Sequence, residues 1–221
     1  MAQRILVSTS AGKDSTLALH ELLSQGAFEV EALLTTVTGG YERISMHGVR
    51  RELLQAHAEA LGFPLHEVRI TPDVTYSSYE QAMYSALTPY RDRGVRHVLH
   101  GDIFLEDLRS YRDHNLATLG MAAVYPLWGR STAELARTFC GLGYRAFVTC
   151  IDTEALPASF VGRAYDAEFL RDLPPTVDPC GENGEFHTFV VEGPVLRERI
   201  PVRLGEVEDQ GRFVFRDLLP A

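Results

Sequence analysis

The feature that most constrains the fold is a regular alternation of short apolar runs and amphipathic stretches through the first half of the chain. The apolar runs, which predict strands, cover residues 5–7, 30–37, 65–70 and 97–99. Between them, apolar residues recur at helical spacing within residues 18–26, 49–62, 79–94 and 105–119. Strand and helix in alternation predict an α/β fold with a doubly wound parallel sheet. In such a sheet, ligands bind at the carboxyl ends of the strands.

The second half of the chain follows a looser pattern. Ser131 and Glu134 form a capping-box pattern for a helix that ends near residue 142. A strand is expected at 144–151, and several prolines then interrupt the chain. Short strands are expected at 188–191 and within 201–215, with a turn at 209–211. We therefore predict a smaller C-terminal α+β domain, with the chain divided into 1–125 and 126–221.

Composition and charge exclude several classes of protein. No apolar run among the 221 residues approaches the roughly 20 needed to cross a bilayer. The apolar run near the N-terminus is too short for a signal peptide, so a cytoplasmic location without membrane contact is expected. The net charge is −9 and no basic run is present, which disfavours stable nucleic-acid binding. Cys140, Cys150 and Cys180 form no CxxC pair, and buried thiols are the expectation for them.

The strongest local motif lies between the first strand and the first helix. Its residues are Ser10, Ala11, Gly12, Lys13, Asp14 and Ser15. Small residues there allow amide groups to converge on an anion at a helix N-terminus, and Lys13 adds a charge, as in a phosphate-binding loop. It is not a Walker A loop, because Val7 and Asp14 stand where glycine and Ser or Thr are needed. From the local sequence alone, a plain turn in which Ser15 or Asp14 caps the helix remains open.

Further motifs extend this observation along nearly the whole chain. The loop resembles the SGGKDS pyrophosphate loop of the N-type ATP pyrophosphatases of the PP-loop superfamily. In chain order, the motifs at 47–49, 55–62, 101–103, 106–109, 125–129 and 178–189 resemble the diphthine–ammonia ligase family, also called the DUF71 ATP-binding family. The resemblance implies an adenine nucleotide alpha hydrolase-like fold, with an ATP-binding domain at 1–125 and a substrate-binding domain at 126–221. It also implies ATP and Mg²⁺ as cofactors.

One loop residue departs from the family pattern, and one motif suggests a metal site. Ala11 stands where a second glycine is usual, which is tolerated if Ala11 adopts a φ below zero. Gly101 and Asp102 follow the fourth strand at the same sheet edge as the loop. Asp102, with Asp14 as the second candidate, would hold Mg²⁺ that bridges the phosphates, although Asp102 could instead cap the next helix.

Two charge-rich segments supply the remaining candidates. Residues 106–113 are typical of a solvated helix face, while the resemblance assigns Asp107, Arg109 and Tyr111 to a substrate pocket. The 178–188 segment contains turn formers and a high density of functional groups. Its substrate-binding candidates are Glu182, Asn183, Glu185 and His187. Diphthamide-forming members have a Glu-Gly-Gly-Glu pattern here, and Asn183 and His187 depart from it.

Together these residues predict an AMP-forming carboxylate–ammonia ligase. Lys13 would offset charge on departing pyrophosphate, while Glu182 and Glu185 would position ammonia or take its proton. Expected partners are ammonia and a carboxylate substrate, either a small molecule or protein-borne, and a homodimer is the default expectation. The alternatives are a PP-loop sulfur transferase, which would use cysteines, and a module that senses ATP without turnover.

Overall fold

The computed structural model describes residues 2–40, 43–44 and 48–221. His47, in the 47–49 motif, lies outside the described residues. Most strands of the first sheet are parallel, in the order β4-β2-β1-β5-β6, and β3 pairs antiparallel with the end of β2. These strands are β1 (Gln3–Ser8), β2 (Phe28–Thr38), β3 (Arg43–Ile44), β4 (Leu65–Ile70), β5 (His97–Leu99) and β6 (Ala122–Val124). The predicted doubly wound α/β fold is confirmed.

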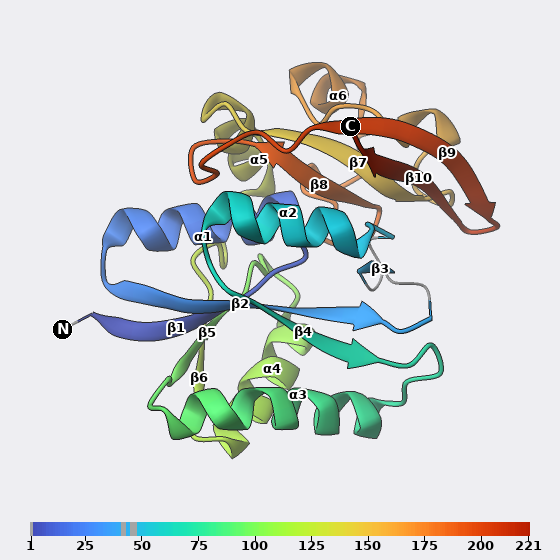
Figure 1. Ribbon diagram of the computed structural model, residues 1–221. Coiled ribbons are helices and arrows are strands. Elements are labelled where there is room, and N and C mark those ends of the chain that lie inside the picture. The colour runs from blue at the N-terminus through green and yellow to red at the C-terminus, as the bar shows by residue number, and fades with distance from the viewer. Residues whose placement is uncertain (1, 41–42, 45–47) are drawn as a thin grey trace.

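Helices cover both faces of this sheet (Figure 1). One face carries α1 (Lys13–Gln25) and α2 (Arg51–Leu61), and the other carries α3 (Tyr76–Asp92) and α4 (Glu106–Thr118). Alternation along β1 explains this arrangement. Ile5 and Val7 belong to the apolar cluster that contains α1 and α2, whereas Leu6 belongs to the cluster that contains α3 and α4. A strand with both faces buried reads as a continuous apolar run, as residues 5–7 do.

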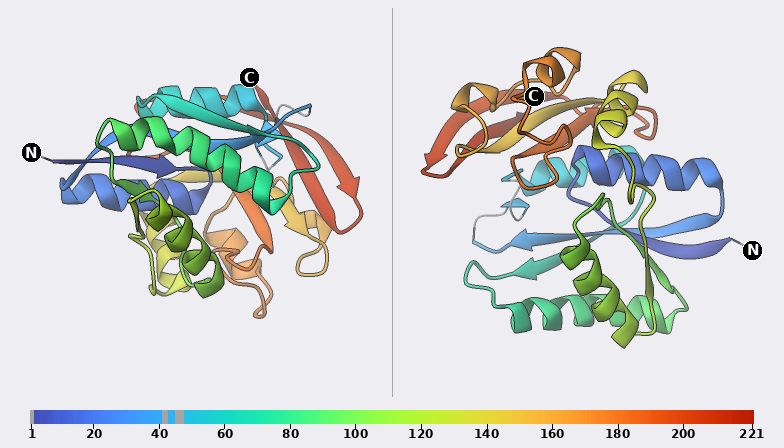
Figure 2. Two further views of the ribbon diagram at one scale, coloured as in Figure 1. Left: turned by 90° about the horizontal axis from the view of Figure 1, so that it is seen from below. Right: turned by 180° about the vertical axis from the view of Figure 1, so that it is seen from behind.

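A second sheet covers α1 and α2 on the side away from the first sheet (Figure 1; Figure 2). Its antiparallel strands lie in the order β8-β7-β10-β9. They are β7 (Arg145–Asp152), β8 (Phe186–Glu192), β9 (Val202–Gln210) and β10 (Phe213–Pro220). The short helices are α5 (Thr132–Gly141), η1 (Ala158–Phe160) and α6 (Ala167–Asp172). The expected smaller C-terminal α+β part is therefore present.

One hydrophobic cluster joins the two sheets through α1 and α2. It contains Ile5 of the first sheet, Leu17 of α1 and Phe189 of the second sheet, each at most 2% exposed. Whether 1–125 and 126–221 are separate domains stays a prediction, as does the cytoplasmic location. None of the helices in the described part of the chain has the length and apolarity to span a bilayer.

Local patterns located most elements and missed a few. α5 begins as expected, since Ser131 Oγ accepts from Glu134 N at 3.4 Å. The short β6 was not predicted, because two of its three residues are alanines, which do not favour strands. α6 was also missed, and its start is determined by Asp166, whose carboxylate accepts from Glu168 N and Phe169 N.

Candidate functional site

The 8–15 loop leads from β1 into α1 and is held by its own hydroxyl groups. Ala11 N donates to Thr9 Oγ1 at 3.0 Å, and Gly12 N donates to Ser10 Oγ at 3.4 Å. The N-cap of α1 is Gly12, which has no side chain to occupy the anion position. Ser15 Oγ donates to Gly12 O at 3.1 Å instead of accepting from a helix amide. The N-cap residue of α1 therefore offers no side chain to a helix amide, and the first helix amide, Lys13 N, donates to Thr188 Oγ1 of β8 at 3.1 Å. A helix N-terminus whose N-cap is glycine leaves room for an anion.

Ala11 has a conformation that differs from the sequence expectation. Its φ is 57°, in the left-handed region, so the condition of a φ below zero is not met. Its methyl group is fully buried, and its carbonyl accepts from Val190 N of β8 at 2.9 Å. The usual glycine at this position is explained by that backbone geometry, which costs about 1–2 kcal/mol for a residue with a Cβ.

The loop after β5 lies directly against the start of α1. A Cβ at Gly101 would stand 2.8 Å from Ser15 N, so only glycine permits this approach. The next residue, Asp102, is 9% exposed and pairs with Arg112 of α4, whose Nε lies 3.0 Å from Oδ2. The N-cap of α4 is Leu105, so the alternative role of Asp102 as a helix cap is wrong.

The 178–188 segment is a turn in which two acids bind the segment's own backbone. The Glu185 carboxylate accepts from Asp178 N, Asn183 N and Asn183 Nδ2, each at 3.0 Å. Asp178 Oδ1 accepts from Cys180 N at 2.9 Å and from Glu182 N at 3.2 Å. These bonds give the segment a defined shape before any ligand binds.

Glu182 extends from that turn to the first sheet. Its Oε1 accepts from Ile103 N at 2.6 Å and from Phe104 N at 3.4 Å, in the loop after β5. Burial raises the pKa of Glu182 to about 7, although these amides act in the opposite direction. A carboxyl group with this pKa can gain or lose a proton near neutral pH.

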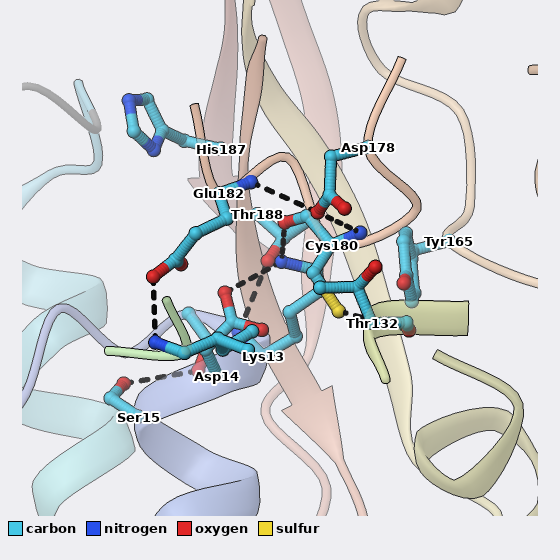
Figure 3. Close-up of polar contacts among 12 residues, drawn as sticks. Lys13, Asp14, Ser15, Thr132, Tyr165, Asp178, Cys180, Glu182, His187 and Thr188 are labelled. Atoms are coloured by element: carbon cyan, nitrogen blue, oxygen red, sulfur yellow. Dashed lines mark hydrogen bonds and ion pairs between the residues drawn. The ribbon is translucent and has the colours of Figure 1, made fainter. Parts of the chain in front are cut away.

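Lys13 extends to the same segment. Its Nζ donates to Asp14 Oδ2 at 2.6 Å and to the Cys180 carbonyl (Figure 3). The ammonium also lies 5.3 Å from the ring centroid of Phe186 and 5.6 Å from that of Tyr165. Burial opposes its charge, but the adjacent Asp14 carboxylate together with Cys180 and Glu182 outweighs burial, and the pKa of Lys13 is raised.

These parts surround one cleft of about 860 Å³ at the carboxyl ends of the strands. It brings together most of the residues predicted from sequence, namely Ser10, Gly12, Lys13, Asp14, Ser15, Gly101, Asp102, Glu182, Asn183 and His187. Threonines at the end of β2 and residues 70–72 after β4 extend the cleft along the sheet edge. Burial and the nearby Lys13 lower the pKa of His187 to about 4, so this ring is neutral at pH 7.

The remaining candidates lie elsewhere. Ala11 and Glu185 are buried next to cleft residues and do not line the cleft themselves. Tyr111 lines a separate groove of about 380 Å³ between α3 and α4. Arg109 stacks on Trp128 at 4.5 Å and pairs with Asp113, while Asp107 lines neither space. The 106–113 segment thus contributes to packing more than to the cleft.

Sequence reasoning missed several cleft residues. Arg112 lies in the charge-rich run but was not distinguished from its neighbours, and His100 directly follows β5, a position that could have identified it. Asp152 and Arg212, paired at 2.7 Å, close the far wall from β7 and the turn before β10. Their contact joins residues 60 positions apart, so no local pattern indicates it.

The donor set fits a magnesium ion that a nucleotide helps to bind. Asp14 and Asp102 line the same cleft, and each pairs with a cationic side chain. Within residues 2–40, 43–44 and 48–221, no cluster of three or more His, Cys, Asp or Glu could form a metal cage. Magnesium commonly binds one or two carboxylates together with phosphate oxygens, which matches this arrangement.

Comparison with known proteins gives concordant matches. Residues 3–123 match the family model described as the diphthamide synthase N-terminal domain, and residues 131–216 match the diphthamide synthase C-terminal domain. The chain is also similar to diphthine–ammonia ligase of Homo sapiens. The two are 23% identical over an alignment 227 positions long, which covers 92% of this chain and 84% of the human protein.

Proposed function

The chain belongs to the diphthamide synthase family, and from this premise we propose that it is an ATP-dependent ligase. It would adenylate a substrate carboxylate and convert it with ammonia into an amide, releasing AMP and pyrophosphate. The observation that carries this proposal is the cleft itself. A helix N-terminus with glycine as its N-cap lies behind a small-residue loop and faces an acid-bearing turn across one cavity at the strand ends.

The loop would bind the two outer phosphates of ATP. Its amides and the α1 N-terminus supply fixed dipoles, and Ser10 and Ser15 add hydroxyl groups. Asp14 and Asp102 would hold Mg²⁺, which neutralises charge on the phosphates when it is bound. The α-phosphorus would then face the centre of the cleft, where a substrate carboxylate can approach it.

The reaction would proceed in two displacements. A carboxylate oxygen attacks the α-phosphorus and the bond to the β-phosphate oxygen breaks, which gives an acyl-adenylate and pyrophosphate. Ammonia then attacks the acyl carbon, AMP leaves with the bridging electron pair, and the extra proton passes to a base. Glu182 is the base we propose, because its carboxylate lines the cleft and its pKa is about 7. The walls of the cleft would restrict water that could hydrolyse the acyl-adenylate.

The thiols favour this proposal over sulfur transfer. Burial raises the pKa of Cys140 and Cys180, and it raises that of Cys150 to about 12. A sulfur carrier needs an accessible thiolate near neutral pH, and these environments oppose one. The acids of the 178–188 segment, which lies along the cleft, favour an enzyme over a module that only senses ATP.

The acceptor would be a carboxylate on a protein or a small molecule. The human relative is named for diphthine, which makes diphthine the first acceptor to test. Asn183 and His187 depart from the pattern of diphthamide-forming members, so small carboxylates form the second set.

Oxygen-18 transfer tests the proposal directly. The acceptor carboxylate is labelled with oxygen-18, and the protein is incubated with acceptor, ATP, Mg²⁺ and ammonium. Adenylation places one labelled oxygen in AMP, detected by mass spectrometry, and produces pyrophosphate in equal amount. ADP and orthophosphate as products would contradict the proposal. Tight ATP binding without turnover for every acceptor would favour the sensing module.

A further inference from the structure

The side chain of Lys13 is held by groups of the protein itself. It is 4% exposed, and its ammonium donates to Asp14 Oδ2 and to the Cys180 carbonyl while it lies over the Phe186 ring. Two of the three N–H donors of the ammonium are therefore used within the protein. We propose that Lys13 is a positioning residue that fixes the 178–188 segment over the cleft, and not a ligand of the nucleotide. This rests on the proposed ligase function, whose base belongs to that segment.

The main chain of the loop supports the same connection. Lys13 N donates to Thr188 Oγ1 at 3.1 Å, and Ala11 O accepts from Val190 N at 2.9 Å. The Lys13 side chain contacts the start of the 178–188 segment, and the loop backbone contacts its end and β8. Because α1 and β8 also pack together in the core, these contacts hold the segment against the loop at both ends.

Glu182 provides the third of three contacts that connect the 8–15 loop, the 178–188 segment and the loop after β5 to one another. It lies two positions after Cys180 and accepts from Ile103 N, and Gly101 of the same strand end packs on Ser15 of α1. The loop therefore connects to the segment through Lys13, the segment connects to the β5 loop through Glu182, and the β5 loop connects back to α1. Without the hydrogen bond from Lys13 to Cys180, the segment would be joined to the first sheet on the cleft side through Glu182.

Charge explains why a lysine serves as this link. The Asp178 carboxylate disfavours ionisation of Asp14, and Asp14 disfavours ionisation of Glu182. A buried ammonium among them offsets this repulsion and satisfies the Cys180 carbonyl. An apolar side chain of similar length would do neither.

The test compares Lys13→Met with the protein's own sequence, using ATP with Mg²⁺ and no acceptor. Methionine keeps the length and the apolar stem but removes the ammonium. We expect the Kd for ATP, measured by calorimetry, to change by less than about 3-fold, since loss of a charged phosphate contact would weaken binding by about 10-fold or more. In hydrogen–deuterium exchange without nucleotide, amides of residues 178–188 should exchange about 10-fold faster or more.

Leu22→Ala is the matched control, because Leu22 is buried at the distant end of the same helix. It should reduce overall stability and raise exchange broadly, whereas Lys13→Met should affect residues 178–188 and 101–104 most. If Lys13→Met does not fold, Lys13→Gln repeats both measurements with a shorter neutral donor. Weakened ATP binding with unchanged exchange at 178–188 would overturn the inference. If the parent protein fails to bind ATP, the proposed function fails, while the exchange measurement still tests Lys13.

Discussion

The three acids of the 178–188 segment, Asp178, Glu182 and Glu185, have different hydrogen-bond partners. Glu185 and Asp178 accept hydrogen bonds from the segment's own backbone and so maintain its shape. Glu182 instead reaches across to Ile103. Sequence spacing gave Glu182 and Glu185 equal weight as catalytic candidates. Their partners differ, and this difference makes Glu182 the better candidate for chemistry and Glu185 a support for the turn.

The pKa of Glu182 leads to a prediction about stability. Since the folded pKa is about 7 and the ordinary value is 4.5, the folded protein retains a proton that the unfolded chain loses between these values. The stability contributed by Glu182 therefore falls as pH rises through this window. Glu182→Gln keeps an acceptor for Ile103 N without the charge. Its melting temperature relative to the parent should increase from pH 5 to pH 8, and a constant difference would contradict the assignment.

The free-energy cost of the left-handed backbone conformation at Ala11 can be measured. Ala11→Gly removes the cost of the left-handed conformation, which stabilises the folded protein by about 1–2 kcal/mol. It also loses a buried methyl group, worth about 0.8 kcal/mol, and increases the conformational freedom of the unfolded chain, worth about 0.4–1 kcal/mol, and both changes destabilise. We expect a net change within about 1 kcal/mol in urea unfolding. Ala18→Gly, equally buried but within α1, should cost about 2 kcal/mol. Equal losses in both variants would contradict this account.

At the scale of elements, the site depends on how closely α1 approaches the loop after β5. β1 and β5 are adjacent and parallel, so both loops emerge at one sheet edge. Gly101 then determines the distance between them, because its missing side chain leaves room for the Ser15 backbone. Asp102 reaches the cleft as a result of this packing.

Gly101→Ala should separate these two elements. The added Cβ would meet Ser15 N at 2.8 Å, and the necessary shift should cost about 1–3 kcal/mol and weaken ATP binding. Gly141→Ala, at the end of α5, is the control, since nothing lies within 4 Å of its added Cβ. It should leave ATP affinity unchanged. The measurements are urea unfolding and ATP calorimetry, and normal ATP affinity in Gly101→Ala would contradict the packing argument.

At the scale of the whole molecule, the two sheets are connected by polar contacts as well as by the shared core. Asp217 of β10 is 9% exposed and accepts from Arg50 Nη2 at 2.7 Å and from Arg43 Nη1 at 2.9 Å. These arginines belong to β3 and to the start of α2, so one carboxylate joins the first sheet to the last strand of the chain. This contact stabilises the packing of the second sheet over α2.

Asp217 should make this connection sensitive to acid. Burial would raise its pKa, but the hydrogen bonds from Arg50 and Arg43 outweigh burial and lower it. Its contribution to stability is therefore present above the ordinary carboxyl pKa and is lost as pH falls through the lower folded value. Asp217→Asn should cost about 1–3 kcal/mol at pH 7, with a smaller cost at pH 3, in urea unfolding. A cost independent of pH would contradict the ion pairing.

The sequence by itself determined the α/β class, the order of most strands and helices, and most of the segments that line the cleft, including the loop at 10–15. These features are encoded by short-range periodicity and by small residues next to strand ends, which act within a few positions along the chain. Only the tertiary structure decided what each side chain contacts. Lys13 and Cys180 lie 167 positions apart, and Arg50 and Asp217 lie 167 apart as well. Contacts at such separations depend on how completed elements pack, so residue types alone could not show that Lys13 faces the second sheet or that Arg112, more than Arg109, enters the cleft.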